Sequence, residues 1–219
     1  MLFGPRKHGG RALPVRERRF GLMRDFSIIL FDGFETLDAM GPAEIVGVMK
    51  ETYRLRFFSR NGGIVTSDQG ARVDTLPFSD IQPGGVILIP GGAGTRVLIR
   101  DAGYIAAIRE LSEASAYTLT VCTGSPVLAM TGLLDGLAAT SNKQLFSWAQ
   151  SVNTSVRWLP SARWVADGKF YTSSGVTAGM DMTLGFVRDT VSYAAARAVA
   201  EGIEYLWNED KDADPFAKS

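Results

Sequence analysis

The sequence predicts an α/β fold in which a doubly wound, mostly parallel sheet carries helices on both faces. Three short runs, 26–31, 85–90 and 117–121, are apolar almost throughout, as strands buried in a parallel sheet are. Each run is followed, after a short connection, by a segment whose apolar residues recur at helical spacing. Repeated strand–helix units of this kind indicate an open sheet covered on both sides.

The first quarter of the chain supplies one such unit and a further strand. After the strand 26–31 we expect a helix over 37–51, with Gly41-Pro42 as a helix start signal. Residues 53–59 alternate between apolar and polar side chains, which predicts a strand, and the following Asn61-Gly62-Gly63 predicts a turn.

The middle of the chain repeats the strand–helix pattern twice. The strand 85–90 ends in a glycine-rich loop and is followed by a helix over 101–115. The strand 117–121 leads directly into an apolar helix over 125–134.

The last third of the domain predicts a hairpin and two helices. Residues 163–173 read as two short strands around the turn Asp167-Gly168. Residues 177–206 then supply two helices that separate near Ser192.

The chain is interpreted as one domain, 25–207, between two terminal segments. Residues 1–24 hold seven basic residues and one acid, which predicts a disordered basic leader, with a mitochondrial-type transit peptide as the alternative. Residues 208–219 predict an acidic, solvated C-terminal tail. The acids outnumber the bases in the domain itself, which argues against nucleic-acid binding.

The low numbers of cysteine and histidine residues exclude several kinds of site. The chain has one cysteine, Cys122, and one histidine, His8, which lies in the leader. An intrachain disulfide, a CxxC redox pair, a multi-cysteine zinc site, a Ser-His-Asp triad, a Cys-His dyad and a histidine metal site are therefore not expected. The chemistry that a family resemblance implies below requires no cofactor either. No apolar run reaches the length of a membrane span and no signal-peptide core follows the leader, so we expect a cytoplasmic protein without membrane contact.

Cys122 stands where a nucleophile is placed in many α/β enzymes. It follows a buried strand directly and precedes Thr123-Gly124-Ser125-Pro126 and a helix. A sharp strand-to-helix turn projects its central side chain into the cleft, as the nucleophile elbow of hydrolases does. We expect the helix amino terminus to stabilise a thiolate and lower the cysteine pKa, and Gly124 to leave space beside the sulfur. The alternative is a small buried hydrophobic side chain.

Two further loops end at the same edge of the predicted sheet, where ligands bind in folds of this class. Consecutive glycines in 91–94 favour an anion or oxyanion pocket, with a tight turn as the alternative. In the loop 32–41, Asp38 lies just before the predicted helix, so partial burial would raise its pKa and suit proton transfer. Helix N-capping is the alternative role for Asp38, and Glu35 is the rival acid.

These segments together resemble the ThiJ/PfpI superfamily, which is class I glutamine amidotransferase-like and shares a flavodoxin-like fold. The similarity covers essentially all of 25–207. The matching segments are Leu37-Asp-Ala-Met-Gly-Pro42, Ile89-Pro-Gly-Gly-Ala-Gly-Thr95, Val121-Cys-Thr-Gly-Ser125, Gly132-Leu-Leu-Asp-Gly136, Ala139-Thr140 and Ser174-Gly-Val-Thr-Ala-Gly-Met-Asp181.

Within this superfamily the chain is most similar to the isonitrile (isocyanide) hydratase subgroup. Other branches carry a histidine near the nucleophile, whereas this chain has Thr123 after Cys122 and no histidine in the domain. Related hydratases commonly read Ala-Thr-Thr-His-Trp where this chain has Ala139-Thr-Ser-Asn-Lys143, so one wall of the implied pocket differs. The resemblance also implies a homodimer and a small-molecule substrate.

The resemblance implies cysteine-dependent hydration of a small isocyanide to an N-substituted formamide through a thioimidate. Cys122 is then the nucleophile, Asp38 the proton donor and acceptor, and Thr123 a hydrogen-bond donor to developing charge or to Asp38. The implied substrate-binding residues are Gly91, Gly92, Gly124, Gly175 and Val176. Trp148 and Met180, like Val176, are candidates for an apolar pocket wall, with core packing as the alternative.

Two other functions fit the same residues. One is a cysteine hydrolase or glyoxalase-type enzyme that acts on a carbonyl compound. The other is a ligand-binding or stress-sensing protein without enzyme activity, in which Cys122 is oxidised to the sulfinic acid.

Overall fold

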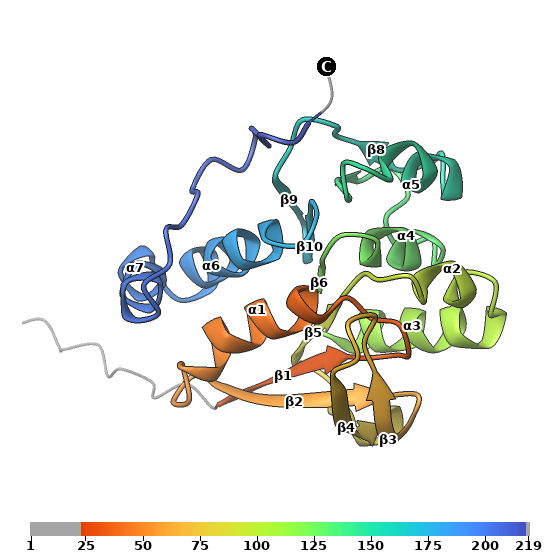
Figure 1. Cartoon of the computed structure of the whole chain (residues 1–219), viewed down its shortest axis with the longest axis horizontal. Coiled ribbons are helices and arrows are strands. Elements are labelled where there is room, and N and C mark those ends of the chain that lie inside the picture. Colours follow the sequence, from red (N-terminus) through yellow and green to blue (C-terminus); the bar gives the residue numbers. More distant parts are fainter. Residues whose placement is uncertain (1–22, 218–219) are drawn as a thin grey trace, which may run out of the picture.

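The computed structural model describes residues 23–217, and it confirms the predicted doubly wound α/β fold (Figure 1). An eight-stranded sheet has the order β3-β4-β2-β1-β5-β6-β10-β9. Neighbouring strands from β4 to β10 are parallel, and each edge carries one antiparallel strand, β3 or β9. Because β1 lies between β2 and β5, the strand order reverses there, which is where doubly wound folds bind ligands.

The main sheet contains the following strands in chain order: β1 (Arg24–Ile29), β2 (Tyr53–Ser59), β3 (Asn61–Thr66), β4 (Arg72–Pro77), β5 (Val86–Ile89), β6 (Tyr117–Thr120), β9 (Trp164–Asp167) and β10 (Phe170–Ser173). A small second sheet pairs β7 (Ala138–Ala139) with β8 (Arg157–Trp158). The helices are α1 (Thr36–Gly47), α2 (Thr95–Leu98), α3 (Ala102–Ala114), α4 (Gly124–Ala129), α5 (Phe146–Val152), α6 (Ala178–Thr190) and α7 (Tyr193–Gly202), with a 3-10 turn at Phe78–Asp80.

Two apolar layers hold the helices to the two faces of the sheet. On one face, Phe26, Ile28 and Leu30 of the first strand and its extension pack with α1 and α6. On the other face, Ile29 packs with residues of α3, α4 and α5. Alternate residues of β1 thus enter opposite layers, as the pleat of a strand requires. Within residues 23–217, no helix combines the length and the apolar character needed to cross a membrane.

The structure corrects several predicted boundaries. The segment 61–63 is not a turn but the start of β3, an edge strand in which Gly62 and Gly63 have φ of 73° and 84°. Turn-forming residues are tolerated there because edge strands accept glycine and twist. The helix predicted over 125–134 ends at Ala129, and Pro42 lies inside α1 rather than at its start. Residues 1–22, most of the predicted leader, lie outside the described residues.

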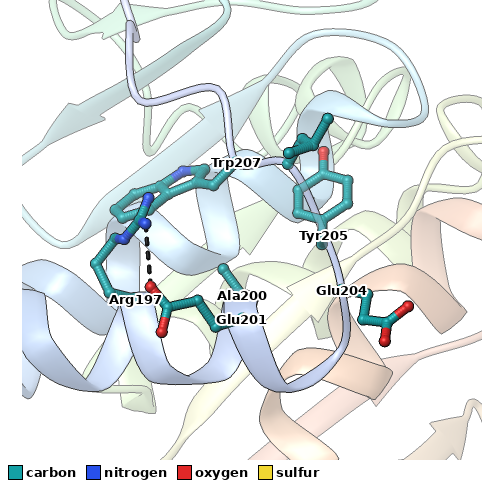
Figure 2. A pocket seen from close by; sticks show the side chains of 7 residues that line it. Arg197, Ala200, Glu201, Glu204, Tyr205 and Trp207 are labelled. Carbon is teal, nitrogen blue, oxygen red and sulfur yellow. Dashed lines mark hydrogen bonds and ion pairs between the residues drawn. The ribbon is translucent and has the colours of Figure 1, made fainter.

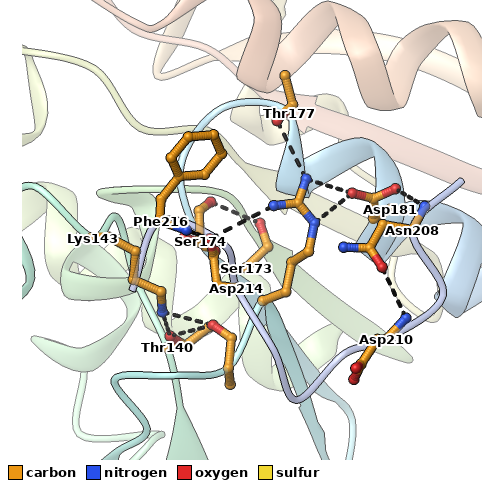
Figure 3. Close-up of polar contacts among 12 residues, drawn as sticks. Thr140, Lys143, Ser173, Ser174, Thr177, Asp181, Asn208, Asp210, Asp214 and Phe216 are labelled. Atoms are coloured by element: carbon orange, nitrogen blue, oxygen red, sulfur yellow. Dashed lines mark hydrogen bonds and ion pairs between the residues drawn. The ribbon is translucent and has the colours of Figure 1, made fainter. Parts of the chain in front are cut away.

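Residues 208–217, within the predicted solvated tail, are mostly exposed, and a few contacts tie them to the domain. Asp214 is buried, its backbone N–H donates to the Ser161 carbonyl at 2.7 Å, and the Lys211 carbonyl accepts from Arg163 and Trp164. A buried ion pair anchors this segment (Figure 3). Arg163 donates to Asp181, whose other oxygen accepts from Tyr205 and from the Asn208 backbone.

The ion pair between Arg163 and Asp181 is expected to be essential for stability. Both side chains are almost fully buried, at 6% and 0% exposure, so Asp181→Ala leaves the Arg163 guanidinium in the interior with the more distant Asp214 carboxylate, at 3.8 Å, as its remaining ion-pair partner. We expect a loss of about 3–5 kcal/mol in the free energy of unfolding, measured by urea denaturation. The matched control is Glu201→Ala, which removes the exposed pair with Arg197 and should cost less than about 1 kcal/mol. Similar losses in both variants would contradict this account.

Candidate functional site

Five loops meet at the carboxyl edge of the sheet and form the candidate site. Asp38 lies in the first turn of α1, which follows β1, and Gly91 and Gly92 follow β5. Cys122 follows β6, and the loops after β7 and β10 add Asn142 and residues 174–176. The segments after β1, β5, β6 and β10 come together because these strands are parallel neighbours whose carboxyl ends share one edge, and Asn142 joins them from the small second sheet.

The Cys122 elbow is a strained turn. Cys122 has φ of 58°, a left-handed conformation that non-glycine residues rarely adopt. Its backbone N–H is held by the carbonyls of Ser173 and Ser174, both at 3.2 Å. A second strained residue, Val176, with φ of 40°, lies in the neighbouring loop. Strain of this kind persists only where the surrounding structure holds it, and it clusters at functional sites.

Asp38, and not Glu35, is the acid that faces the sulfur. Asp38 is fully buried, and its Oδ2 accepts the Gly91 N–H at 2.9 Å. Its Oδ1 has no hydrogen-bond partner among the described residues, and the neighbouring Cys122 thiol lowers the pKa of the carboxyl. Glu35 instead takes the N-cap position of α1 and accepts from Gln69 at 3.0 Å. Asp38 therefore does not cap the helix.

Burial raises the pKa of both members of this pair. It raises the pKa of Asp38 from 3.8 to about 7, with the Glu35 charge adding to the effect and the Gly91 N–H and the Cys122 thiol opposing it. Burial also raises the pKa of the Cys122 thiol to about 12, and the Asp38 charge acts in the same direction. The expectation of a lowered cysteine pKa is thus wrong, because loss of solvent outweighs the amino terminus of the short helix α4. Between about pH 7 and pH 12 the pair therefore holds one proton, on the sulfur, and below about pH 7 Asp38 binds a second.

Groups beside the sulfur that favour its thiolate form partly offset the rise in the Cys122 pKa that burial causes. The side-chain amide of Asn142 donates to Sγ at 3.1 Å, and this amide and the backbone N–H groups of Thr123 and Val176 lower the pKa of the thiol. Asn142 was not among the residues singled out from the sequence. The signal that points to it is its place in the segment 139–143, where the chain departs from related hydratases.

The glycine loop has a different role from the one expected. The Gly91 N–H is taken by Asp38, and the Gly92 N–H is taken by the Thr123 hydroxyl at 3.0 Å. Neither N–H is free for a developing oxyanion. The Thr123 hydroxyl also accepts from Thr95 at 3.2 Å, so it ties the elbow to the glycine loop. These residues position Asp38 and Cys122.

Gly124 is likewise required for packing. A Cβ at this position would lie 2.2 Å from the Ile89 carbonyl and 2.9 Å from the Pro90 carbonyl. The absent side chain thus lets the elbow pass the end of β5, which differs from the expected role of leaving space beside the sulfur.

A cavity of about 260 Å³ opens beside the elbow. Its lining includes Asn142, Lys143, Gly175, Val176, Thr177 and Phe216. Gly175 and Val176 therefore lie where substrate-binding residues were expected. Trp148 lies elsewhere, under the Arg96 guanidinium at 5.4 Å, and Met180 packs against Gly41 of α1.

A second cavity, of about 400 Å³, lies beside α7 and contains none of the expected site residues (Figure 2). Arg197 and Glu201 pair across its rim, with Tyr205 and Trp207 along one side. Among residues 23–217, no three histidine, cysteine, aspartate or glutamate side chains gather closely enough to hold a metal ion.

Asp38→Asn is expected to stabilise the protein above pH 7. The folded state binds the Asp38 proton more tightly than the unfolded state, so this contribution to stability is full below about pH 4 and is lost as the pH rises through 7. Asparagine keeps the shape and carries no charge. Urea denaturation should show the stability of the variant relative to wild type rising by roughly 2–3 kcal/mol between pH 5 and pH 8. A variant that is less stable at pH 8 would contradict a buried, proton-binding Asp38.

Comparison with known proteins gives relatives with enzymatic and regulatory roles. The chain is 32% identical to the isonitrile hydratase of Pseudomonas putida over 81% of this chain and 76% of that protein. It is 25% identical to the HTH-type transcriptional regulator CdhR of Pseudomonas aeruginosa over 82% of this chain, and it spans about half of that regulator's length, 54%.

Solved structures and a family profile agree with this relationship. A ThiJ/PfpI family protein from Pseudomonas syringae superposes with a TM-score of 0.77 at 26% identity, over 94% of this chain and 85% of that one. The flavodoxin-like fold implied by the resemblance is thereby confirmed. The profile of the DJ-1/PfpI family matches residues 25–189. The chain therefore belongs to the DJ-1/PfpI family.

Proposed function

We propose that the protein hydrates a small isocyanide, R–N≡C, to the N-substituted formamide, R–NH–CHO. The observation that carries the proposal is the burial of Cys122 and Asp38 beside each other, away from bulk water, where burial raises the pKa of both groups. The similarity to an isonitrile hydratase supports the choice of substrate class. The terminal carbon of an isocyanide accepts a nucleophile and then a proton, which this pair can supply together.

In the first half of the reaction, the thiol adds across the terminal carbon. Asp38 Oδ1 takes the proton from Cys122 Sγ as the S–C bond forms, and it delivers that proton to the same carbon. The product is a thioimidate, R–N=CH–S–Cys122, with no net change in charge. The unpartnered Oδ1 is the oxygen available for this transfer, because Oδ2 is held by Gly91.

In the second half, water attacks the thioimidate carbon. The Asp38 carboxylate accepts a proton from the water and passes it to the nitrogen, which gives R–NH–CH(OH)–S–Cys122. The C–S bond then breaks, the hydroxyl becomes the formamide carbonyl, and its proton returns through Asp38 to the sulfur. The hydrogen bond from Asn142 stabilises the departing sulfur.

The cavity beside the elbow suits a compact R group. Its volume of about 260 Å³ and its walls of Val176, Gly175 and Phe216 favour an apolar substituent of modest size.

Cys122→Ala should abolish turnover. The purified variant is expected to convert a small aromatic isocyanide to its formamide no faster than buffer does, because no other cysteine exists in the chain. Asp38→Asn should lower kcat/KM by about 10²–10⁴-fold, since it removes the proton carrier and keeps the shape. The matched control, Asp80→Asn, alters an exposed acid and should leave turnover unchanged. Turnover retained in Cys122→Ala would overturn the mechanism.

The pH dependence of kcat/KM should report the protonation of Asp38. Below about pH 7 Asp38 binds a second proton and cannot accept one from the thiol, so kcat/KM should fall as the pH drops through that value. It should stay level to about pH 10, because the next proton leaves only near the raised pKa of Cys122. Lys143 lines the same cavity, and burial lowers its pKa to about 8. The acid limb must therefore persist in Lys143→Gln, and its absence there would assign the limb to the lysine instead.

A further inference from the structure

The Asn142 side chain contacts the reacting sulfur with one end and the protein backbone with the other. Its Nδ2 donates to Cys122 Sγ at 3.1 Å. Its Oδ1 accepts the backbone N–H of Gln144 at 2.8 Å and of Leu145 at 3.2 Å, just before α5. An amide carbonyl only accepts and an amide nitrogen only donates, so these two backbone bonds fix which end faces the sulfur.

The surroundings are shaped to keep the amide in place. A Cβ on Gly175 would lie 2.6 Å from Asn142 Nδ2, so the glycine leaves the room that the amide occupies. The adjacent Ser141 hydroxyl donates to the Cys122 carbonyl at 2.8 Å. Residues 141 and 142 therefore hold both the backbone and the side chain of the cysteine.

We infer that Asn142 is a catalytic residue of this chain, a fixed and uncharged donor that stabilises negative charge on the Cys122 sulfur. Its amide does not titrate, and its direction is set by the start of α5. Hydrogen bonds to a charged acceptor are among the stronger ones, so loss of this donor should reduce the fraction of thiolate severalfold. The role in turnover rests on the proposed hydration, but the effect on the sulfur does not.

The test measures the sulfur directly, without an isocyanide. Cys122 is the single cysteine, so the rate of alkylation by iodoacetamide reports its thiolate alone. In Asn142→Asp the shape and the bonds to Gln144 and Leu145 are kept, whereas the donor is replaced by an acceptor. We expect alkylation at pH 8 to be at least about tenfold slower than in the wild type.

Two further variants distinguish the loss of the hydrogen bond to sulfur from a disturbance of the local fold. Asn142→Ser keeps an oxygen for the backbone N–H groups and loses the contact with sulfur, so alkylation should slow although access to the thiol is wider. Gly175→Ala keeps Asn142 and displaces its amide, so it should also slow the reaction. If Asn142→Asp fails to fold by circular dichroism, these two variants decide the matter.

Asn208→Asp is the matched control for charge. Its Oδ1 accepts the N–H two residues along, from Asp210, as Asn142 does from Gln144, and its backbone N–H bonds Asp181 rather than the sulfur. This variant should alkylate at the wild-type rate. Rates within twofold of the wild type in folded Asn142→Asp, or equal slowing in Asn208→Asp, would overturn the inference. Absence of isocyanide turnover in the wild type would count against the proposed hydration and leave this result unaffected.

Discussion

The burial of a carboxyl and a thiol against each other is the constraint around which this site is organised. Each group alone resists ionisation in the interior, and burial raises the pKa of both. Ionising both would place two negative charges side by side with few donors to offset them. Above about pH 7 the pair therefore keeps one proton, and the surrounding loops determine which atoms can exchange it.

The register of the parallel sheet sets the distance between these two groups. Ile89 of β5 lies opposite Thr120 of β6, so the glycine loop and the cysteine elbow begin at the same level. Side chains would prevent their approach, since a Cβ on Gly91 would lie 2.6 Å from the Thr123 N–H nitrogen and 2.9 Å from Asp38 Oδ2. The register of β5 and β6 thus aligns the glycine loop with the elbow, and the small residues at the strand ends let α1 and the elbow come into contact.

The sequence alone locates Cys122 and Asp38 because both follow buried strands, where local pattern and topology agree. It misses Asn142, which reaches the sulfur from a loop twenty residues further along the chain. It misses the hairpin of β3 and β4 because edge strands lack a clear apolar pattern. It also predicts the wrong direction for the shift in the Cys122 pKa, because burial depends on every residue packed around the thiol. The homodimer, the cytoplasmic location and the small-molecule substrate stay predictions.

The burial of Cys122 also bears on the choice between two proposed roles, hydration of an isocyanide and redox sensing. Oxidation of cysteine by peroxide favours an exposed thiolate of low pKa. Cys122 is only 6% exposed, and its proton is held by burial and by the Asp38 charge. A reaction that consumes the thiol and its proton together avoids the free-energy cost of a buried charge. The S–H bond is exchanged for S–C and C–H bonds, and no free charge is left in the interior. Addition to the terminal carbon of an isocyanide is such a reaction, so the burial of Cys122 supports the proposed hydration rather than oxidation by peroxide.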